Sequence, residues 1–155
     1  MILRPATAAD AEAVATVYLA SRAAGSPNVR WAHGEADVRA WLANHLIPHG
    51  GMTVAVDGKT LHGYIALHEH WVDHLYLHPI SWRRGLGSRL INHAKQSRPT
   101  RLHLWTFQSN TPARAFYEHH GFIIDHLTDG ADNEENEPDV LYVWQGKQGS
   151  AGQGP

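Results

Sequence analysis

The chain has 155 residues, of which 43% are hydrophobic and 18% are charged, and its formal net charge at pH 7 is −2. This length and composition predict one globular domain with a core of its own. No stretch is apolar enough to span a membrane and the N-terminus has no signal-peptide core, so we expect a soluble, cytoplasmic protein. The chain has no cysteine, which excludes disulfides, thiolate metal ligands and a covalent thioester on the protein.

Hydrophobic periodicity predicts one mixed α/β domain over residues 1–145. A capping box at Thr7 marks the start of the first helix, and Asp-Gly-Lys at 57–59 predicts a hairpin. Residues 146–155 are of low complexity and are predicted to be disordered. In chain order we expect a strand at 2–4, helices at 7–22 and 35–46, strands at 52–56, 60–67 and 71–77, a helix from 85, a strand at 101–107, a helix at 110–121, and strands at 122–128 and 140–144.

Charge is unevenly distributed along the chain. No Asp or Glu occurs from His74 through Tyr117, a span that holds seven of the thirteen Lys and Arg residues, whereas seven of the fifteen acids lie between Asp125 and Asp139. The basic middle indicates an anionic ligand and the acidic end a cationic one; two solvated surfaces of opposite charge are the alternative. Since the balance of the whole chain is not basic, we expect no nucleic-acid partner.

The stretch "WRRGLGSRL" at 82–90 stands between an apolar strand and a helix. Its glycines, Gly85 and Gly87, let a ligand approach the backbone closely. The first turn of the helix offers amides without intrahelical partners, which suits a phosphate; a glycine-rich turn with no ligand is the alternative. A Walker loop and a dinucleotide fingerprint are excluded, because the Lys of the first and the third glycine of the second are absent. The candidate phosphate ligands are Arg83, Arg84, Gly85, Leu86, Gly87 and Ser88.

Two motifs together resemble the GNAT superfamily of acyl-CoA-dependent N-acetyltransferases, and the resemblance runs from about Ile2 to Trp144. The first motif is the strand, loop and helix around Gly85. The second follows the pattern "N..A..FY...GF" over residues 110–122. Trp82 departs from the superfamily, which usually has Arg or Gln at that position. This puts a ligand role of that side chain in doubt and leaves the backbone amides of the loop intact.

The resemblance implies a single GNAT-like domain with a mixed, mostly antiparallel sheet of about seven strands, splayed at its centre, and about four helices. It implies acetyl-CoA as co-substrate, with the diphosphate on the glycine loop and the pantetheine arm along Leu75, Tyr76 and Leu77. The acetyl group would pass directly to a primary amine of a small molecule or peptide in a ternary complex, and a homodimer is left open. The second motif would add Asn110, Ala113, Phe116 and Tyr117 to the cofactor site.

Transfer to an amine needs a proton donor for the leaving thiolate and a base for the amine. Tyr117 is the candidate acid, because a phenol has a pKa only ~1.5 units above that of a thiol; simple packing on an apolar helix face is the alternative. Asp73 and His74 are candidate bases on opposite faces of one strand. Glu69 and His70 could act through water, and the sequence does not choose among the four.

Two other functions are compatible with the sequence. A non-catalytic acyl-CoA sensor would bind the nucleotide without releasing thiol. A metal-binding module would use the thirteen histidines, but no HExxH pattern occurs and we expect no metal site. The acidic stretch could form an acceptor pocket with "WAHGE" at 31–35, with Glu134, Glu135 and Glu137 attracting a cationic amine; a solvated loop is the alternative.

Overall fold

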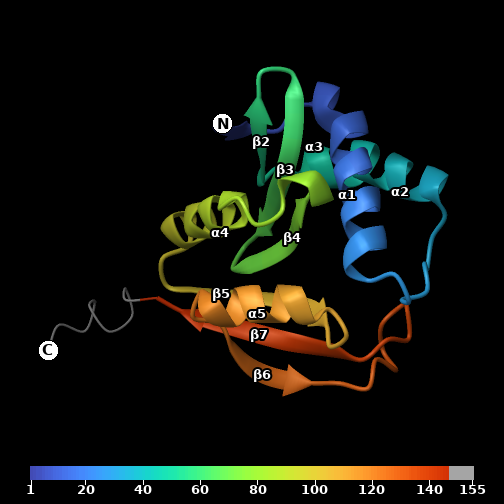
Figure 1. The fold of residues 1–155 in the computed structure, drawn as a ribbon, viewed down its shortest axis with the longest axis vertical. Coiled ribbons are helices and arrows are strands. Elements are labelled where there is room, and N and C mark those ends of the chain that lie inside the picture. Colours follow the sequence, from blue (N-terminus) through green and yellow to red (C-terminus); the bar gives the residue numbers. More distant parts are fainter. Residues whose placement is uncertain (147–155) are drawn as a thin grey trace, which may run out of the picture.

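A seven-stranded sheet runs through the protein and carries helices on both faces (Figure 1). The structure is a computed structural model that describes residues 1–146. Residues 147–155, which make up all but the first residue of the tail predicted to be disordered, lie outside the described residues. The strands are ordered β1-β2-β3-β4-β5-β7-β6, and every neighbouring pair is antiparallel except β4 with β5. Their bounds are β1 (Ile2–Pro5), β2 (Met52–Asp57), β3 (Thr60–His68), β4 (Trp71–Leu77), β5 (Arg101–Phe107), β6 (Ile123–Leu127) and β7 (Asp139–Gln145).

The helices form two layers. Helix α1 and the run from α2 to α3 pack on one face of the sheet, whereas α4 and α5 pack on the other. The second predicted helix is longer than expected, since a π-helical turn joins α2 to α3. The bounds are η1 (Ala8–Asp10), α1 (Ala11–Gly25), α2 (Glu35–Trp41), η2 (Leu42–Leu46), α3 (Ile47–His49), η3 (Pro79–Ser81), α4 (Leu86–Ser97) and α5 (Thr111–His119).

Alternate residues of β2 and β3 face two separate cores. Val54 and Tyr64 pack with α1, whereas Ala55 and Ile65 pack with α4. All four side chains are fully buried. These strands therefore need apolar residues on both faces, which explains why they read as nearly continuous apolar runs.

Strands β4 and β5 pair only where they begin. Trp71 lies opposite His103, and the His103 amide donates a 2.8 Å hydrogen bond to the carbonyl of His70. No other residue pair of the described chain is in register between these two strands. The sheet is therefore splayed at its centre, as predicted, and the two separated edges leave backbone groups that a ligand can pair with.

A bulge interrupts β4 close to this divergence. Ala66 of β3 lies opposite His74, and Leu67 lies opposite Val72, so Asp73 is an extra residue without a partner on β3. A bulge bends its strand and re-aims the side chain that it carries. The simple alternation of faces expected along β4 is thus interrupted at Asp73.

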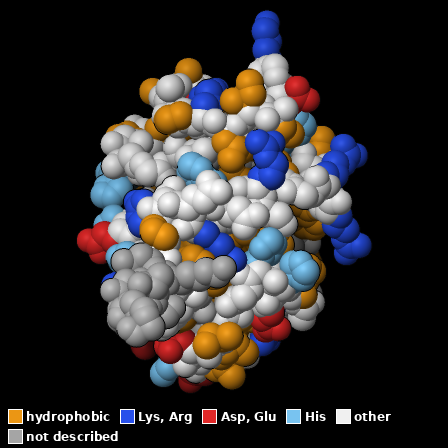
Figure 2. Space-filling model, turned by 90° about the vertical axis from the view of Figure 1, so that its left-hand side faces the viewer, with side chains coloured by type: hydrophobic (Ala, Val, Ile, Leu, Met, Phe, Trp, Pro, Cys, Tyr) orange, Lys and Arg blue, Asp and Glu red, His pale blue; other side chains and the backbone are white. Residues whose placement is uncertain are grey.

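Charge is also uneven in space. Figure 2 shows the face that carries α4, on which Lys and Arg are spread over the upper and middle parts, whereas Asp and Glu gather mainly toward the lower end. Within residues 1–146, no helix combines the length and the apolar composition needed to cross a bilayer.

Candidate active site

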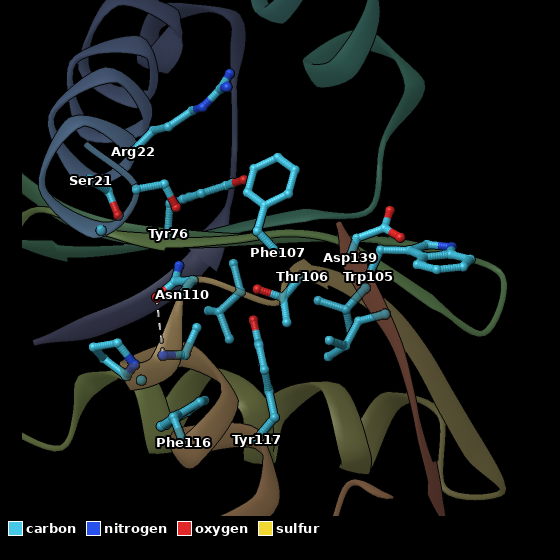
Figure 3. Close-up of a pocket in the computed structure, with 18 of the residues that line it drawn as sticks. Ser21, Arg22, Tyr76, Trp105, Thr106, Phe107, Asn110, Phe116, Tyr117 and Asp139 are labelled. Atoms are coloured by element: carbon cyan, nitrogen blue, oxygen red, sulfur yellow. Dashed lines mark hydrogen bonds between the residues drawn. The ribbon is translucent and has the colours of Figure 1, made fainter. Parts of the chain in front are cut away.

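A cavity of about 1140 Å³ opens where β4 and β5 diverge. The two strands supply its walls, with the end of α1 on one side and the start of α5 on the other (Figure 3). Most of the residues predicted from the sequence line it: Asp73, Leu75, Tyr76, Leu77, Arg83, Gly85, Gly87, Ser88, Asn110, Ala113, Phe116 and Tyr117. The structure thus brings together two motifs that lie far apart in the sequence.

Three of the predicted residues do not line the cavity: His74, Arg84 and Leu86. Leu86 is only 4% exposed and packs in the core with the rest of α4, so only its backbone amide is available to a ligand. Arg84 is exposed and lies outside the lining. The sequence pattern places the loop beside the cavity but does not separate side chains that turn into the core from those that face the cavity.

Gly85 is the point where the loop turns into α4. Its φ of 82° lies in the left-handed region that favours glycine, and a Cβ built there would meet no atom within 4 Å. The constraint therefore comes from the backbone, and the space beside it is open. Helix α4 begins at Leu86, and its first amides have no intrahelical acceptors, so this end can receive an anion.

Gly87 makes room for the second motif. A Cβ at this position would lie 3.1 Å from the ring of Phe116, which is closer than a side chain tolerates without a shift of its neighbour. Asn110 begins the helix that carries Phe116, because its Oδ1 accepts a 3.2 Å hydrogen bond from the amide of Ala113. The glycine loop and the "N..A..FY" motif are therefore in direct contact.

Trp82 has a defined role in the structure. Its indole Nε1–H donates a 2.9 Å hydrogen bond to the carbonyl of Leu77, the last residue of β4. The same ring lies beside Gly25 at the end of α1 and lines the cavity. Trp82 thus supplies a hydrogen-bond donor where the superfamily usually has Arg or Gln, and its hydrogen bond connects the loop to the end of β4.

Tyr117 is 8% exposed and lines the cavity from α5. Figure 3 shows its hydroxyl pointing toward Thr106 of β5. The ring packs against Phe122 and Tyr142, with centroids 5.6 Å and 6.1 Å away. Burial raises the pKa of Tyr117 well above its ordinary value. This position is compatible with both interpretations, because the ring is in the core while the residue reaches the cavity.

The two candidate bases have different surroundings. Asp73 lines the cavity at the bulge, and partial burial raises the pKa of its carboxyl despite the nearby His68 and His49. His74 lies on the other face of β4, where its Nδ1 is 2.9 Å from the hydroxyl of Tyr64. The structure brings Asp73 to the cavity and does not bring His74 there.

His74 is surrounded by aromatic rings. The indole of Trp41 stacks on it with an interplanar angle of 27°, and the rings of Tyr18 and Tyr76 lie at centroid distances of 5.4 Å and 5.2 Å. Burial lowers the pKa of His74 to about 4. The imidazole is therefore neutral near pH 7 and a weak base.

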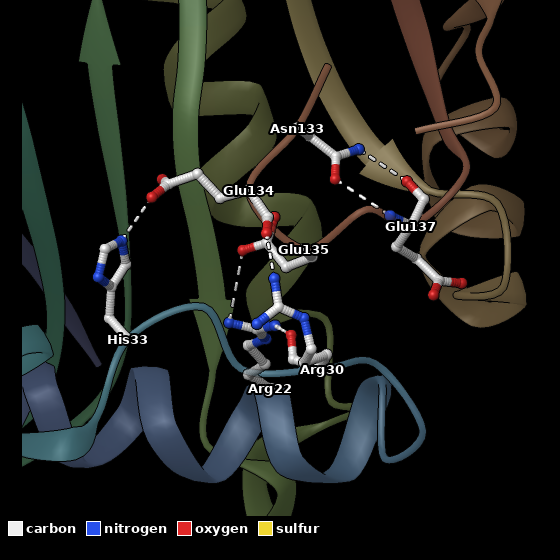
Figure 4. A network of polar contacts seen from close by, with 7 residues as sticks. All are labelled: Arg22, Arg30, His33, Asn133, Glu134, Glu135 and Glu137. Carbon is white, nitrogen blue, oxygen red and sulfur yellow. Dashed lines mark hydrogen bonds and ion pairs between the residues drawn. The ribbon is translucent and has the colours of Figure 1, made fainter. Parts of the chain in front are cut away.

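The acidic stretch folds over the end of α1 (Figure 4). Oε2 of Glu134 lies 2.6 Å from Nε2 of His33. Oε2 of Glu135 lies 3.8 Å from the Arg22 guanidinium, which also donates a hydrogen bond to the carbonyl of Arg30. The predicted proximity to the segment at 31–35 is thus present at His33. Glu134 and Glu137 do not line the cavity, whereas Asp129, Asp132, Glu135 and Asp139 do.

Several lining residues were not predicted as site residues. Tyr18 and Ser21 lie on the helix predicted at 7–22, and their hydroxyl groups on that helix were the available signal. Trp82 was treated only as a departure from a motif. His119 and His120 occupy unspecified positions inside the second motif, so the motif itself assigns them no role.

The fold and the site were compared with known proteins. The profile of the acetyltransferase (GNAT) family matches residues 16–122. The chain belongs to this family. The predicted superfamily, the predicted fold and the prediction of an acyl-CoA-dependent N-acetyltransferase are thereby confirmed.

Two curated relatives support the assignment. The chain is 30% identical to the peptidyl-lysine N-acetyltransferase YiaC of Escherichia coli over 149 residues, 92% of this chain and 96% of that protein. It is 36% identical to the probable N-acetyltransferase Rv2775 of Mycobacterium tuberculosis over 91 residues, 57% of this chain and only 48% of that one. The first match extends over nearly the whole of both proteins.

Solved structures agree on the fold. Apo-form YjaB from Escherichia coli superposes with a TM-score of 0.78 at 20% identity, covering 94% of this chain and 99% of that one. The PaiA N-acetyltransferase from Thermoplasma acidophilum, solved with coenzyme A, gives 0.68 at 17% identity and covers 93% and 98%. Within residues 1–146, no group of three His, Asp or Glu side chains is arranged to hold a metal ion.

Proposed function

We propose that this GNAT acetyltransferase transfers the acetyl group of acetyl-CoA to a primary amine of a peptide or small molecule, by direct attack in a ternary complex. One observation carries the proposal: the open edges of β4 and β5 lead from the glycine loop to Tyr117 within a single cavity. A ligand with a phosphate group at one end and a thioester at the other matches this layout.

The residues of the cavity fit such a ligand. The diphosphate would lie on the amides of 84–88, with Arg83 and Ser88 beside it, because these groups border the open space at Gly85. The pantetheine arm would pair with the backbone of residues 75–77, which has no partner on β5. The wall on the other side of the arm is formed by Asn110, Ala113 and Phe116. Acetyl-CoA, when bound, supplies the activated acyl group.

Tyr117 would donate a hydrogen bond to the leaving sulfur. Since burial raises its pKa, the phenol is protonated over the whole physiological pH range and is always available as a donor. Each unit of pKa above that of the thiol adds about 1.4 kcal/mol to complete proton transfer. The raised pKa therefore favours donation of a hydrogen bond in the transition state over full transfer of the proton.

Asp73 is the better-placed base. Its raised pKa makes it a stronger base than an exposed carboxylate, and it lies in the cavity wall, where one water could connect it to the amine. His74 is the second candidate, because it would have to act from the other face of β4. A loss of activity in Asp73→Asn with little change in His74→Gln would support this order.

The acceptor would be a cationic amine. Asp129, Asp132 and Asp139 line the cavity, and Glu135 is offset by Arg22. Carboxylates at this position attract an ammonium group before it loses its proton. The relative from Escherichia coli is named as a peptidyl-lysine N-acetyltransferase, which is consistent with an amine on a long alkyl chain.

A thiol-release assay with acetyl-CoA and a panel of amines tests the proposal. The panel should contain lysine peptides, free amino acids and polyamines. We expect Tyr117→Phe to lower kcat by about 10²-fold or more without changing the melting temperature by more than a few degrees. Tyr142→Phe is the matched control, since its hydroxyl bonds to Glu118 and does not line the cavity. Binding of acetyl-CoA without thiol release for any amine would instead establish a sensor.

A further inference from the structure

The end of α5 lies against the first turn of α4. Phe116 packs on Gly87, and one turn later the Nε2 atom of His120 is 2.9 Å from the Oγ atom of Ser88. Both partners of this hydrogen bond line the cavity. An imidazole therefore contacts a hydroxyl in the first turn of α4, beside the amides to which the proposed function assigns the phosphates.

The groups around His120 are cationic or neutral. The Lys95 ammonium of α4 donates to its carbonyl, the ring of Phe116 lies 4.6 Å away, and His119 approaches edge-on at 5.2 Å. Glu118 is the acid nearest in sequence on α5, and it accepts the hydroxyl of Tyr142. Burial, Lys95 and His119 together lower the pKa of His120. The ring is thus neutral near pH 7 in the free protein, and a dianionic neighbour would reverse that preference.

We propose that His120 and Ser88 form a proton-linked pair that completes the phosphate site of acetyl-CoA. When Nε2 of His120 carries a proton, it donates to Ser88 Oγ, and the Ser88 hydroxyl is free to donate its own proton to a phosphate oxygen. When the ring is neutral with its hydrogen on Nδ1, Nε2 accepts the hydroxyl proton of Ser88, and Ser88 has no donor left for the phosphate. This follows from the inventory of a hydroxyl, which has one donor and two acceptor positions. We assign the tautomer with its hydrogen on Nδ1 to the free protein, so that restoring the donor requires uptake of a proton at Nε2.

The proposal rests on the proposed function and gives a sign for the pH dependence. Bound phosphate raises the pKa of His120 above its value in the free protein, so binding takes up a proton between the two values. Affinity for the nucleotide is then highest at a pH below the pKa that His120 has in the free protein. It falls as the pH rises, until the pH exceeds the pKa that His120 has in the complex. Each pH unit between these two pKa values of His120 lowers the affinity about tenfold.

Isothermal titration with dephospho-CoA is the direct test. This probe retains the diphosphate and lacks the 3′-phosphate, whose own pKa of about 6 would otherwise mask the proton uptake. Titrations in two buffers of different ionisation enthalpy, from pH 5.5 to 8, give the number of protons taken up. We expect net uptake by the wild-type protein and an affinity about tenfold lower at pH 8 than at pH 5.5.

Variants separate the pair from other titrating groups. His120→Gln retains a donor for Ser88 without titrating, so we expect no proton uptake and a flat pH profile. Ser88→Ala should bind more weakly at low pH and lose most of the pH dependence; full retention would overturn the relay through Ser88. His93→Gln is the control, because His93 bonds to Thr53 and does not line the cavity, and it should behave as wild type.

The two levels of the argument fail differently. If the wild-type protein releases thiol from acetyl-CoA but takes up no proton, or if His120→Gln keeps the wild-type uptake, the proton-linked pair is refuted and the acetyltransferase proposal stands. If neither CoA nor dephospho-CoA binds, the proposed function fails as well.

Discussion

Replacing Trp82 by Phe tests mainly one hydrogen bond. The substitution keeps an aromatic ring in the loop and removes the indole donor that is 2.9 Å from the carbonyl of Leu77, together with the outer indole atoms near Gly25. A hydrogen bond of this kind contributes about 1 kcal/mol, and an unpaired carbonyl left partly buried adds a comparable cost. For a chain of this size, 1 kcal/mol lowers the melting temperature by about 2–4 °C.

The same change should affect acetyl-CoA more than chemistry. Leu77 ends the strand edge that would hold the pantetheine arm, so a loosened end should raise the KM for acetyl-CoA several-fold, with kcat within about twofold. Thermal melting and initial rates at varied acetyl-CoA measure the two effects. Trp82→Gln restores a donor at the position where the superfamily often has one, so it should recover part of the KM. Wild-type KM and melting temperature in Trp82→Phe would refute the reasoning.

Three further predictions concern the glycine loop, a buried histidine and the acidic wall of the cavity. Gly85→Ala forces a side chain into a left-handed φ of 82°, so we expect a loss of about 1–2 kcal/mol in chemical denaturation; wild-type stability would contradict it. The pKa of His74 is about 4 in the folded state, so the unfolded state binds the extra proton below pH 6.5 and stability falls as pH drops toward 4. Urea titrations at pH 7 and pH 5 should show a difference that is smaller in His74→Gln, by at most about 2 kcal/mol; an equal difference would exclude His74 as the source. Asp129→Asn with Asp132→Asn should raise the KM for a lysine peptide and not for acetyl-CoA, with Glu137→Gln, outside the cavity, as the control; an unchanged peptide KM would remove the acidic wall from acceptor binding.

The elements that were predicted well have local signals. The order of helices and strands follows from hydrophobic periodicity, and the start of α5 follows from a capping residue, Asn110, whose hydrogen bond spans three residues. The glycine loop was predicted from two glycines between a strand and a helix, and the structure adds that Gly85 adopts a backbone conformation that other residues avoid. The splay of β4 from β5 came from the family resemblance, since no local pattern encodes a missing strand pair.

The orientation of individual side chains was predicted less well. Asp73 sits at a bulge, and a bulge depends on the register with β3, which the sequence of β4 alone does not contain. His74 was a candidate base, yet its position is decided by rings from α1, α2 and β3 that surround it. Leu86 was included with the phosphate ligands for its backbone amide, and the sequence did not show that its side chain belongs to the core.

Trp82 and His120 show why motif matching stops short of the site. Trp82 was considered only for the side chain that it replaces. Its structural role is to donate a hydrogen bond to the backbone carbonyl of Leu77, five residues earlier. His120 and Ser88 are 32 residues apart in the sequence, so no local pattern predicts that their side chains are in contact. In each case a polar group of the loop or of its adjoining strand is paired by a residue whose identity the motif does not specify. A departure from a motif should therefore be judged by which backbone or side-chain group the new residue pairs with, because that pairing, and not residue identity, decides whether the loop keeps its shape.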